Sequence, residues 1–507
     1  MKEGVLTRGD LASRLKGRRR KPERGVSRGH SSRRCDDGEG PNEWESEPTM
    51  TLDSAMHQKP AKAGPTTKNR GEASKVRRGG EASTAGNGDE RSGSGDLMEQ
   101  VVARDNMWAA WKRVKGNVGS PGGDGMTVQE LPSFLRANWE RIREELIAGR
   151  YRPQPVLRRE IPKSGGGMRE LGIPTVLDRL IQQAILQVLQ PRFDPTFSSS
   201  SYGFRPGRSA QQAVCCAQQL VRSGRSIVVD VDLERFFDRV QHDVLMGRLA
   251  RRIEDKRLLR LLRRYLEAGV MVHGVVTERY EGTPQGGPLS PLLANVLLDE
   301  VDRELEKRGH TFVRYADDCN VYVRTRRAGE RVMASLRRLY ASLRLSINES
   351  KSAVAPATER KFLGFGLWRS REGDLRREVA PRAIAAMKDR VRDITARNRG
   401  RSMSSVVEEL RGYLLGWKAY FRLAETPRTF ARLDKWIRHR LRTVQLKQWR
   451  GSSTTMYRAL RRLGAPEAVA RRVASSSRRW TRNSRLHLHI VLPNAHFDAI
   501  GVPRLAA

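Results

Sequence analysis

Hydrophobic and polar positions change their period along the chain, and these changes predict its elements. Residues 178–190 have a helical period that Pro191 should end, with an apolar face made of Leu180, Ile181, Ala184, Ile185, Val188 and Leu189. Residues 226–233 form a continuous β-branched run, typical of a buried strand. Residues 311–323 form two such runs around a polar tip, which predicts a hairpin. A further helix is predicted from Ser290, as N-cap, and Pro291 to Gly309.

Residues 1–96 follow neither period. They are rich in Gly, Ser, Arg and Glu with isolated apolar residues, so we predict a disordered basic tail, with ordered sequence beginning near Leu97. The run Arg18–Lys21 could be an RNA-contacting arm or an import signal, although a solvated tail explains it more simply. No apolar run reaches the ~18 residues of a membrane span, so no membrane partner is expected. The four cysteines contain no CxxC pair, which fits a reducing compartment and excludes a disulfide scaffold.

The charge of the chain points to a polyanionic partner. The 507 residues carry 96 Lys plus Arg against 57 Asp plus Glu, a formal net charge of +39. Residues 376–507, which are helical and basic in pattern, hold 30 basic and 9 acidic residues, a net charge of +21. Because a solvated surface usually mixes both signs, this excess favours nucleic acid, with strongly salt-dependent binding.

Three aspartates stand where strands end. Asp232 lies at the end of the predicted strand, and Asp317 and Asp318 lie at the tip of the predicted hairpin. Taken alone, the Asp pair could be a polar surface turn. Together, the three carboxylates could gather hard oxygen ligands around paired Mg²⁺ ions, which activate a 3′-hydroxyl and stabilise a leaving pyrophosphate.

A glycine-rich stretch at residues 161–174 is a second candidate site. Its glycines allow a hairpin tip to approach a ligand closely, and Lys163 and Arg169 flank them as cations for a triphosphate. Flexible basic hairpins are common, so this signal is weak by itself. It is not a Walker loop, because no Lys-Ser/Thr pair follows the last glycine into a helix.

The ordered set of motifs resembles bacterial group II intron-encoded reverse transcriptase/maturases, in an endonuclease-lacking form. The matching segments are Gln190–Phe193, Ser201–Gly207, Asp232–Asp238, Gly282–Asn295, Tyr315–Asp318, Leu345–Lys351 and Phe362–Phe365. The resemblance implies an α+β right-hand polymerase, with fingers and palm built from a small antiparallel sheet packed on helices. Residues 97–375 would form fingers and palm, 376–450 an all-α basic maturase-specific thumb, and 451–507 a short DNA-binding segment.

Residue roles follow from this resemblance. Asp232, Asp317 and Asp318 look like the catalytic metal-binding acids, with the Leu233 carbonyl as a further ligand and two Mg²⁺ ions as cofactor. The residues that resemble the dNTP-binding set are Lys163, Arg169, Gln285 and Phe237, the last as a gate against the ribose 2′-OH. Core packing beside Phe236 is an alternative role for Phe237, and both could hold. Tyr315 and Lys351 would support the primer end or the palm.

The basic C-terminal quarter resembles the thumb and DNA-binding segment of the family. Its aromatics are expected to pack between helices, whereas its cations are the candidate RNA- and DNA-binding residues: Arg438, Arg440, Arg442, Lys447, Arg478, Arg479 and Arg482. His487, His489 and His496 form a tempting cluster near the end of the sequence. Their spacing is too short for an HNH metal site and no Cys pairs brace it, so no nuclease is predicted.

The function implied is that of an RNA-directed DNA polymerase and intron maturase. Its partners would be group II intron RNA, target DNA and dNTPs, in the bacterial cytoplasm and at the nucleoid when engaged with DNA. Three alternatives stay open. They are a reverse transcriptase of another lineage (diversity-generating, defence or CRISPR-linked), a splicing-only RNA-binding factor with inactive polymerase, and a nonspecific basic nucleic-acid binder.

Overall fold

The computed structural model describes residues 96–506, apart from 163–167, 273–274, 278–279, 284–285, 398–399, 450–451, 477–478, 480–481 and 485–486, and apart from the side chains of Arg169 and Val275. All but the last residue of the predicted tail 1–96 therefore lies outside the described residues. The first described helix begins at Leu97. No described helix is both long enough and apolar enough to cross a membrane.

The first part of the chain combines helices with a small mixed sheet of order β2-β1-β4-β5. β1 and β2 form the antiparallel hairpin that carries the glycine-rich stretch. The elements of this part are α1 (Leu97–Val102), α2 (Arg104–Gly116), α3 (Leu131–Ile147), β1 (Val156–Pro162), β2 (Met168–Ile173), α4 (Val176–Phe193), η2 (Asp194–Thr196), α6 (His242–Ala250), α7 (Lys256–Glu267), β4 (Val270–Val272) and β5 (Val275–Thr277).

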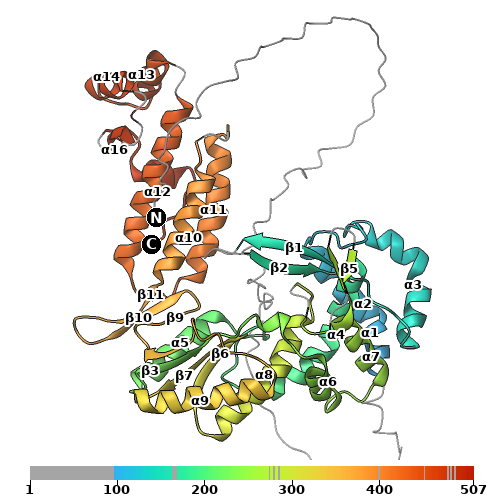
Figure 1. Cartoon of the computed structure of the whole chain (residues 1–507). Coiled ribbons are helices and arrows are strands. Elements are labelled where there is room, and N and C mark those ends of the chain that lie inside the picture. Colours follow the sequence, from blue (N-terminus) through green and yellow to red (C-terminus); the bar gives the residue numbers. More distant parts are fainter. Residues whose placement is uncertain are drawn as a thin grey trace, which may run out of the picture. The chain divides into compact units, whose positions relative to one another are not determined.

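A four-stranded antiparallel sheet of order β6-β7-β3-β8 lies in the region of the predicted palm, with helices on both faces (Figure 1). Val229 and Val231 of β3 pack towards α8 and α9, whereas Val228, which alternates with them, packs towards α5. The elements are α5 (Ala210–Arg222), β3 (Ile227–Val231), η3 (Phe236–Asp238), α8 (Ser290–Lys307), β6 (Thr311–Tyr315), β7 (Asp318–Val323), α9 (Arg326–Ser342) and β8 (Ala353–Pro356).

The structure confirms the predicted strand and hairpin and corrects two helix ends. α4 continues through Pro191 to Phe193, so the prediction that Pro191 ends the helix was wrong. A proline near a C-terminus removes one backbone hydrogen bond, which the buried side chains of α4 compensate by packing. The N-cap of α8 is Leu289, and Ser290 is the first helical residue without a side-chain cap. Gly309 follows the end of α8 with a φ of 69°, as predicted.

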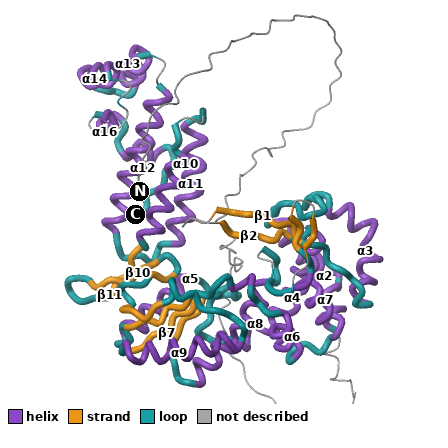
Figure 2. Tube along the Cα trace, in the orientation of Figure 1, coloured by secondary structure: helices purple, strands orange, loops and turns teal. Residues whose placement is uncertain are grey.

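The C-terminal part is helical, and α10, α11 and α12 lie side by side (Figure 2). A three-stranded sheet of order β11-β10-β9 precedes these helices. The elements are β9 (Lys361–Phe362), β10 (Phe365–Arg369), β11 (Leu375–Val379), α10 (Pro381–Ile394), α11 (Met403–Tyr420), α12 (Pro427–Gln448), α13 (Ser453–Arg462), α14 (Glu467–Ser475), α16 (Leu488–Val491) and α17 (Asn494–Ala499). Together, the mixed sheets and helices confirm the predicted α+β class.

A buried arginine fastens the end of the described chain to α12. The Arg438 side chain is 1% exposed, and its guanidinium donates to Asp434 (3.0 Å) and Asp498 (2.5 Å). The Asp434 carboxylate also accepts the backbone N–H groups of Leu505 (3.0 and 3.1 Å) and Ala506 (3.0 Å). The segment after α17 is thus held by a desolvated ion-pair network.

Arg438→Ala is expected to destabilise the thumb by about 3–5 kcal/mol, because it leaves buried carboxylate oxygens without their cation. Differential scanning calorimetry measures the effect. The matched control is Arg471→Ala, whose exposed pair with Glu467 should be worth at most about 1 kcal/mol. Equal melting temperatures for the two variants would contradict the structural role of Arg438.

Candidate active site

The turn between β6 and β7 carries two of the three predicted acids. Ala316, in the middle of Tyr315–Asp318, has a left-handed φ of 57°. The loop at Gly203 lies directly against it, since a Cβ on Gly203 would come 2.2 Å from the Ala316 nitrogen. Only glycine can occupy that position without moving the turn. The half-buried Tyr315 ring lies 6.3 Å from that of Phe204, centroid to centroid.

A fully buried arginine holds this turn from below. Arg314 is 0% exposed and forms an ion pair with Asp302 of α8, which is also 0% exposed (2.5 Å). Its Nη1 donates to the Ala316 carbonyl and to Asn295 Oδ1, both at 2.9 Å. Asn295 in turn donates to the Gly203 carbonyl (2.9 Å). One network therefore fixes α8, the turn and the Gly203 loop together.

Asp232 is held through its backbone. Its N–H donates to Ser352 Oγ (3.0 Å), and its carbonyl accepts the N–H of Asn348 (2.8 Å). The flanking hydrogen bonds of the Leu233–Ile347 bridge use the Asp232 carbonyl and the Glu234 N–H. In this antiparallel pattern the Leu233 carbonyl points away from the bridge, which fits its predicted use as a metal ligand.

The electrostatics of the site favour a cation. Desolvation by the surrounding protein, followed by the negative charges of Asp317, Asp230 and Asp232, raises the pKa of Asp318 to about 7, although Asp318 retains solvent-exposed surface, and Lys351 opposes this rise. The Lys351 ammonium lies 3.4 Å from Asp232 Oδ1. Neighbouring carboxylates repel one another, and a shared proton or a bound cation relieves that repulsion.

The donor set fits a divalent metal ion, although it is not arranged as a complete ligand shell. Among the described residues, no group of three or more His, Cys, Asp or Glu side chains is placed to hold a metal ion. The donors of the site are carboxylate oxygens, which hard divalent cations prefer. The ammonium beside Asp232 occupies part of the space where positive charge is needed.

The backbone of Phe237 is hydrogen-bonded to the loop that leads to Gln285, the predicted nucleotide contact. Its half-buried ring packs edge-on against Phe236, with centroids 5.1 Å apart, so the alternative packing role is present. The Phe237 carbonyl accepts the Thr283 N–H (2.7 Å), and buried His242 Nε2 lies 2.8 Å from the Gly282 carbonyl. The backbone of Phe237, the predicted gate residue, is therefore joined to the segment that leads to residue 285.

Several predicted residues lie where the structure does not describe them. Lys163, Gln285 and Arg478 lie outside the described residues, and for Arg169 only the backbone, in β2, is described. Their roles stay predictions.

The thumb arginines differ from the prediction in their placement. Arg438 and Arg442 are buried, and Arg442 donates to the Leu492 carbonyl and to Asn494. Arg440 is half-buried against Thr395. The guanidiniums of Arg438 and Arg442 bind protein groups and are therefore less accessible to nucleic acid than exposed arginines. Arg479 and Arg482 are exposed and Lys447 is half-buried.

Sequence reasoning missed the residues that position the site. Asp302, Asn295, Ser352 and Arg314 are the clearest cases. Arg314 carried a signal, because it is a charged residue inside a β-branched run directly before the acids. A charge in a predicted buried strand needs a buried partner.

Comparison with known proteins agrees with this geometry. The family model for reverse transcriptase (RNA-dependent DNA polymerase) matches residues 161–367, and that for the group II intron maturase-specific domain matches residues 384–464. The match covers the palm acids and most of the thumb.

Three relatives are similar to parts of the chain. Protein YkfC of Escherichia coli is 40% identical over 193 residues, 37% of this chain and 51% of that protein. The group II intron-encoded protein LtrA of Lactococcus lactis is 35% identical over 208 residues, 41% of this chain and 34% of that protein. The putative COX1/OXI3 intron 1 protein of Saccharomyces cerevisiae is 27% identical over 320 residues, 52% of this chain and 38% of that protein. The chain thus matches about half of the first relative's length and about a third of the length of the other two.

A solved structure of a partial Cas6-RT-Cas1--Cas2 complex is 27% identical over 50% of this chain and 43% of that one. Its TM-score of 0.33 is too low to support a conclusion about this chain.

The three predicted acids lie inside the region that matches the reverse transcriptase model, and domains of this kind generally use divalent metal ions. With the maturase-specific region added, the chain is similar over part of its length to group II intron-encoded reverse transcriptase/maturases such as LtrA.

Because the pKa of Asp318 is raised, the stability of the folded protein should depend on pH. In the metal-free protein, the folded state binds the Asp318 proton more tightly than the unfolded state, so stability falls as pH rises from about 4 through 7. Asp318→Asn has no ionisable carboxyl group at this position, so its stability should not fall in this way as pH rises. We expect its melting temperature in EDTA to exceed that of the wild type by roughly 2–4 °C at pH 8, allowing for solvent screening, and to equal it near pH 4.

Thermal denaturation across this pH range measures the difference. The exposed Asp374, in the turn between β10 and β11, provides the control Asp374→Asn, which should track the wild type at every pH. A constant offset for Asp318→Asn would refute the electrostatic explanation.

Proposed function

We propose that the protein is an RNA-directed DNA polymerase and intron maturase. It binds group II intron RNA, assists its splicing and copies it into DNA during retrohoming. The observation that carries this proposal is the presence, in one chain, of the three acids at the ends of β3 and of the β6–β7 hairpin together with a match to the maturase-specific domain. Splicing itself is RNA chemistry, to which the protein contributes binding energy. The proposed parts are fingers and palm at 97–375, thumb at 376–450 and a DNA-binding segment at 451–507.

The proposed metal site takes two Mg²⁺ ions. Asp232, Asp317, Asp318 and the Leu233 carbonyl would hold them. When bound, Mg²⁺ acts as a Lewis acid for the primer 3′-hydroxyl and the leaving pyrophosphate. The Arg314 network keeps Asp317 and Asp318 at a fixed position, and the Ser352 and Asn348 contacts do the same for Asp232. Such fixed charges need no rearrangement during reaction.

The remaining residues bind substrate and primer in this proposal. Lys163 and Arg169 hold the triphosphate, and Gln285 lies against the incoming nucleotide. Phe237 excludes a ribose 2′-OH, supported by the link from its carbonyl to Thr283. Tyr315 supports the primer end, and Lys351, beside Asp232, supports the palm.

For the nucleic acid backbone, the proposed contacts are Lys447, Arg478, Arg479 and Arg482, with Arg440 at the edge of the thumb. The net charge of +21 over residues 376–507 supports this assignment. A protein with these partners acts in the cytoplasm, at the nucleoid when it engages target DNA.

The polymerase proposal is tested by primer extension on an RNA template with Mg²⁺ and dNTPs. Asp317→Ala combined with Asp318→Ala should lower the extension rate by about 100-fold or more, because both metal-binding carboxylates are lost. Glu330→Ala, an exposed carboxylate on α9 paired with Arg326, is the matched control and should extend primers like the wild type.

The same variants separate the two activities. The double alanine variant should still accelerate splicing of its intron RNA at low Mg²⁺, since splicing uses no protein carboxylate. Undiminished DNA synthesis by the variant would sink the assignment of the acids. Wild-type protein that assists splicing without any DNA synthesis would instead favour the splicing-only alternative.

The gate role of Phe237 has its own test. Phe237→Ala should raise incorporation of ribonucleotides relative to deoxyribonucleotides by about 100-fold, because the space for a 2′-OH opens. Competition between dNTP and rNTP in single-nucleotide extension measures this ratio. Phe236→Leu, a change in the buried neighbour, should lower stability and leave the ratio unchanged. The reverse pattern would reassign the gate.

A further inference from the structure

A fourth carboxylate lies on the active-site face of the palm. Asp230 is two residues before Asp232 on β3, and residues two apart on a strand face the same side of the sheet. Its charge is felt by Asp318, whose pKa it helps to raise. Burial raises the pKa of Asp230 itself, Arg360 opposes this rise, and Asp232 adds to it. Asp230 therefore belongs to the same electrostatic cluster as the proposed metal ligands.

Arg360 binds this carboxylate directly. Its Nε and its Nη2 each lie 2.7 Å from Asp230 Oδ2, and both side chains are largely shielded from solvent, at 32% and 20% exposure. Nη2 also donates to the backbone carbonyl of Lys351. The same guanidinium thus joins the fourth carboxylate to the residue whose ammonium lies beside Asp232.

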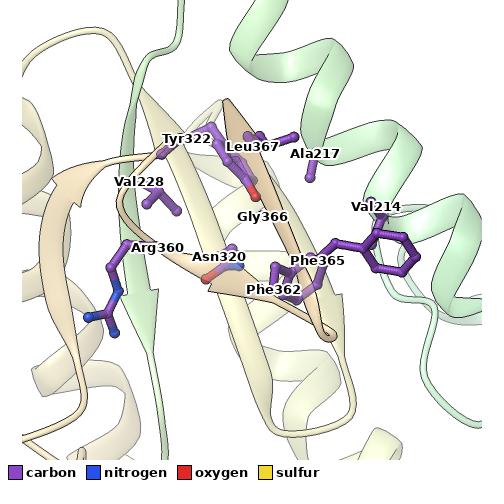
Figure 3. Close-up of a pocket in the computed structure, with 11 residues that line it drawn as sticks. Val214, Ala217, Val228, Asn320, Tyr322, Arg360, Phe362, Phe365, Gly366 and Leu367 are labelled. Atoms are coloured by element: carbon purple, nitrogen blue, oxygen red, sulfur yellow. The ribbon is translucent and has the colours of Figure 1, made fainter. Parts of the chain in front are cut away.

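Arg360 neutralises the charge of the Asp230 carboxylate, and the residue opposite Asp230 on β7 does not. The residue opposite Asp230 on β7 is Asn320, which is 3% exposed. Asn320 Oδ1 has no hydrogen-bond partner among the described residues, and an oxygen cannot neutralise a carboxylate. Figure 3 shows Asn320 within a pocket between β3, β7, α5 and β10, with Phe362 and Phe365 on one side. Arg360 lines the opposite edge, with its guanidinium directed away from the two rings.

We propose that Arg360 is a positioning residue that keeps Asp230 out of the metal-binding set and holds Lys351 beside Asp232. The inference rests on the proposed function, since it assumes the metal site at Asp232, Asp317 and Asp318. The affinity of an oxygen-ligand site for a divalent ion depends on the number of charged ligands. A site with an unpaired fourth carboxylate binds metal more tightly, whereas the Arg360–Asp230 pair presents no net charge there.

Metal binding to the nucleic-acid-free protein tests this directly, with Mn²⁺ as the probe and isothermal titration calorimetry as the measurement. Arg360→Ala should tighten Mn²⁺ binding by about tenfold, because a negative charge within several ångströms of the ion becomes unpaired. Adding Asp230→Asn to Arg360→Ala should return the affinity to the wild-type value. Arg360→Lys, which keeps the charge, should also remain near wild type.

Arg371→Ala is the matched control, because it removes an equal charge from an exposed position beyond β10. Its Mn²⁺ affinity should equal that of the wild type. Thermal denaturation reports whether each variant folds, and Arg360→Gln, which retains a hydrogen-bond donor without charge, replaces Arg360→Ala if the latter does not fold.

Three outcomes overturn the proposal. One is an Arg360→Ala affinity equal to that of Arg371→Ala, and another is a shift that persists when Asp230→Asn is added. Either result, in a protein whose Mn²⁺ binding is lost in Asp317→Asn, refutes the role of Arg360 alone. Wild-type protein that binds no Mn²⁺ refutes the proposed metal site and, with it, this inference.

Discussion

The buried ion pair between Arg314 and Asp302 is the interaction on which the active site depends. Both side chains are removed from water, so each would be costly to bury alone. Arg314 offsets this cost with hydrogen bonds to Asn295 and to the Ala316 carbonyl, which is the backbone of the acidic turn itself. The hydrogen bonds that offset the cost of burying the pair also hold the backbone of the turn that carries Asp317 and Asp318. The stability of this sheet and the position of the acidic turn therefore depend on the same contacts.

Repulsion between the carboxylates of the site destabilises the folded protein. Four carboxylates, counting Asp230, face one region, and Asp318 has a pKa near neutrality as a result. Lys351 and Arg360 each neutralise one member of the cluster, through contacts with Asp232 and Asp230. The two remaining acids lie on the turn that Arg314 holds. Electrostatic strain is thus left where a divalent cation would relieve it, a pattern common at functional sites.

Much of the fold and site could be predicted from local sequence. The β-branched runs around residues 226–233 and 311–323 gave the strands and hairpin correctly, because strand period and turn position are local properties. The acids followed, since they lie at the ends of those runs. Helix ends were less certain, as the passage of α4 through Pro191 shows, because packing of the buried face outweighs one lost hydrogen bond.

The arginines mark the limit of sequence reasoning. Arg438 and Arg479 have the same chemistry in the sequence, yet Arg438 is buried between two aspartates and Arg479 is exposed. Asp434 is four residues before Arg438, but Asp498 is sixty residues away, and only the folded chain brings it close. The same holds for Arg360 and Asp230, which are 130 residues apart. Long-range pairing of charges decides which cations remain available for nucleic acid.

The close contact between Gly203 and Ala316 bears on how this protein could be re-engineered. The two backbones come from segments more than a hundred residues apart, and there is no room for a methyl group between them. A chimera that imports only the acidic turn from another polymerase would set a foreign backbone against an unmatched loop. The smallest transplantable unit is therefore the turn together with the loop around Gly203 and the α8 residues Asn295 and Asp302.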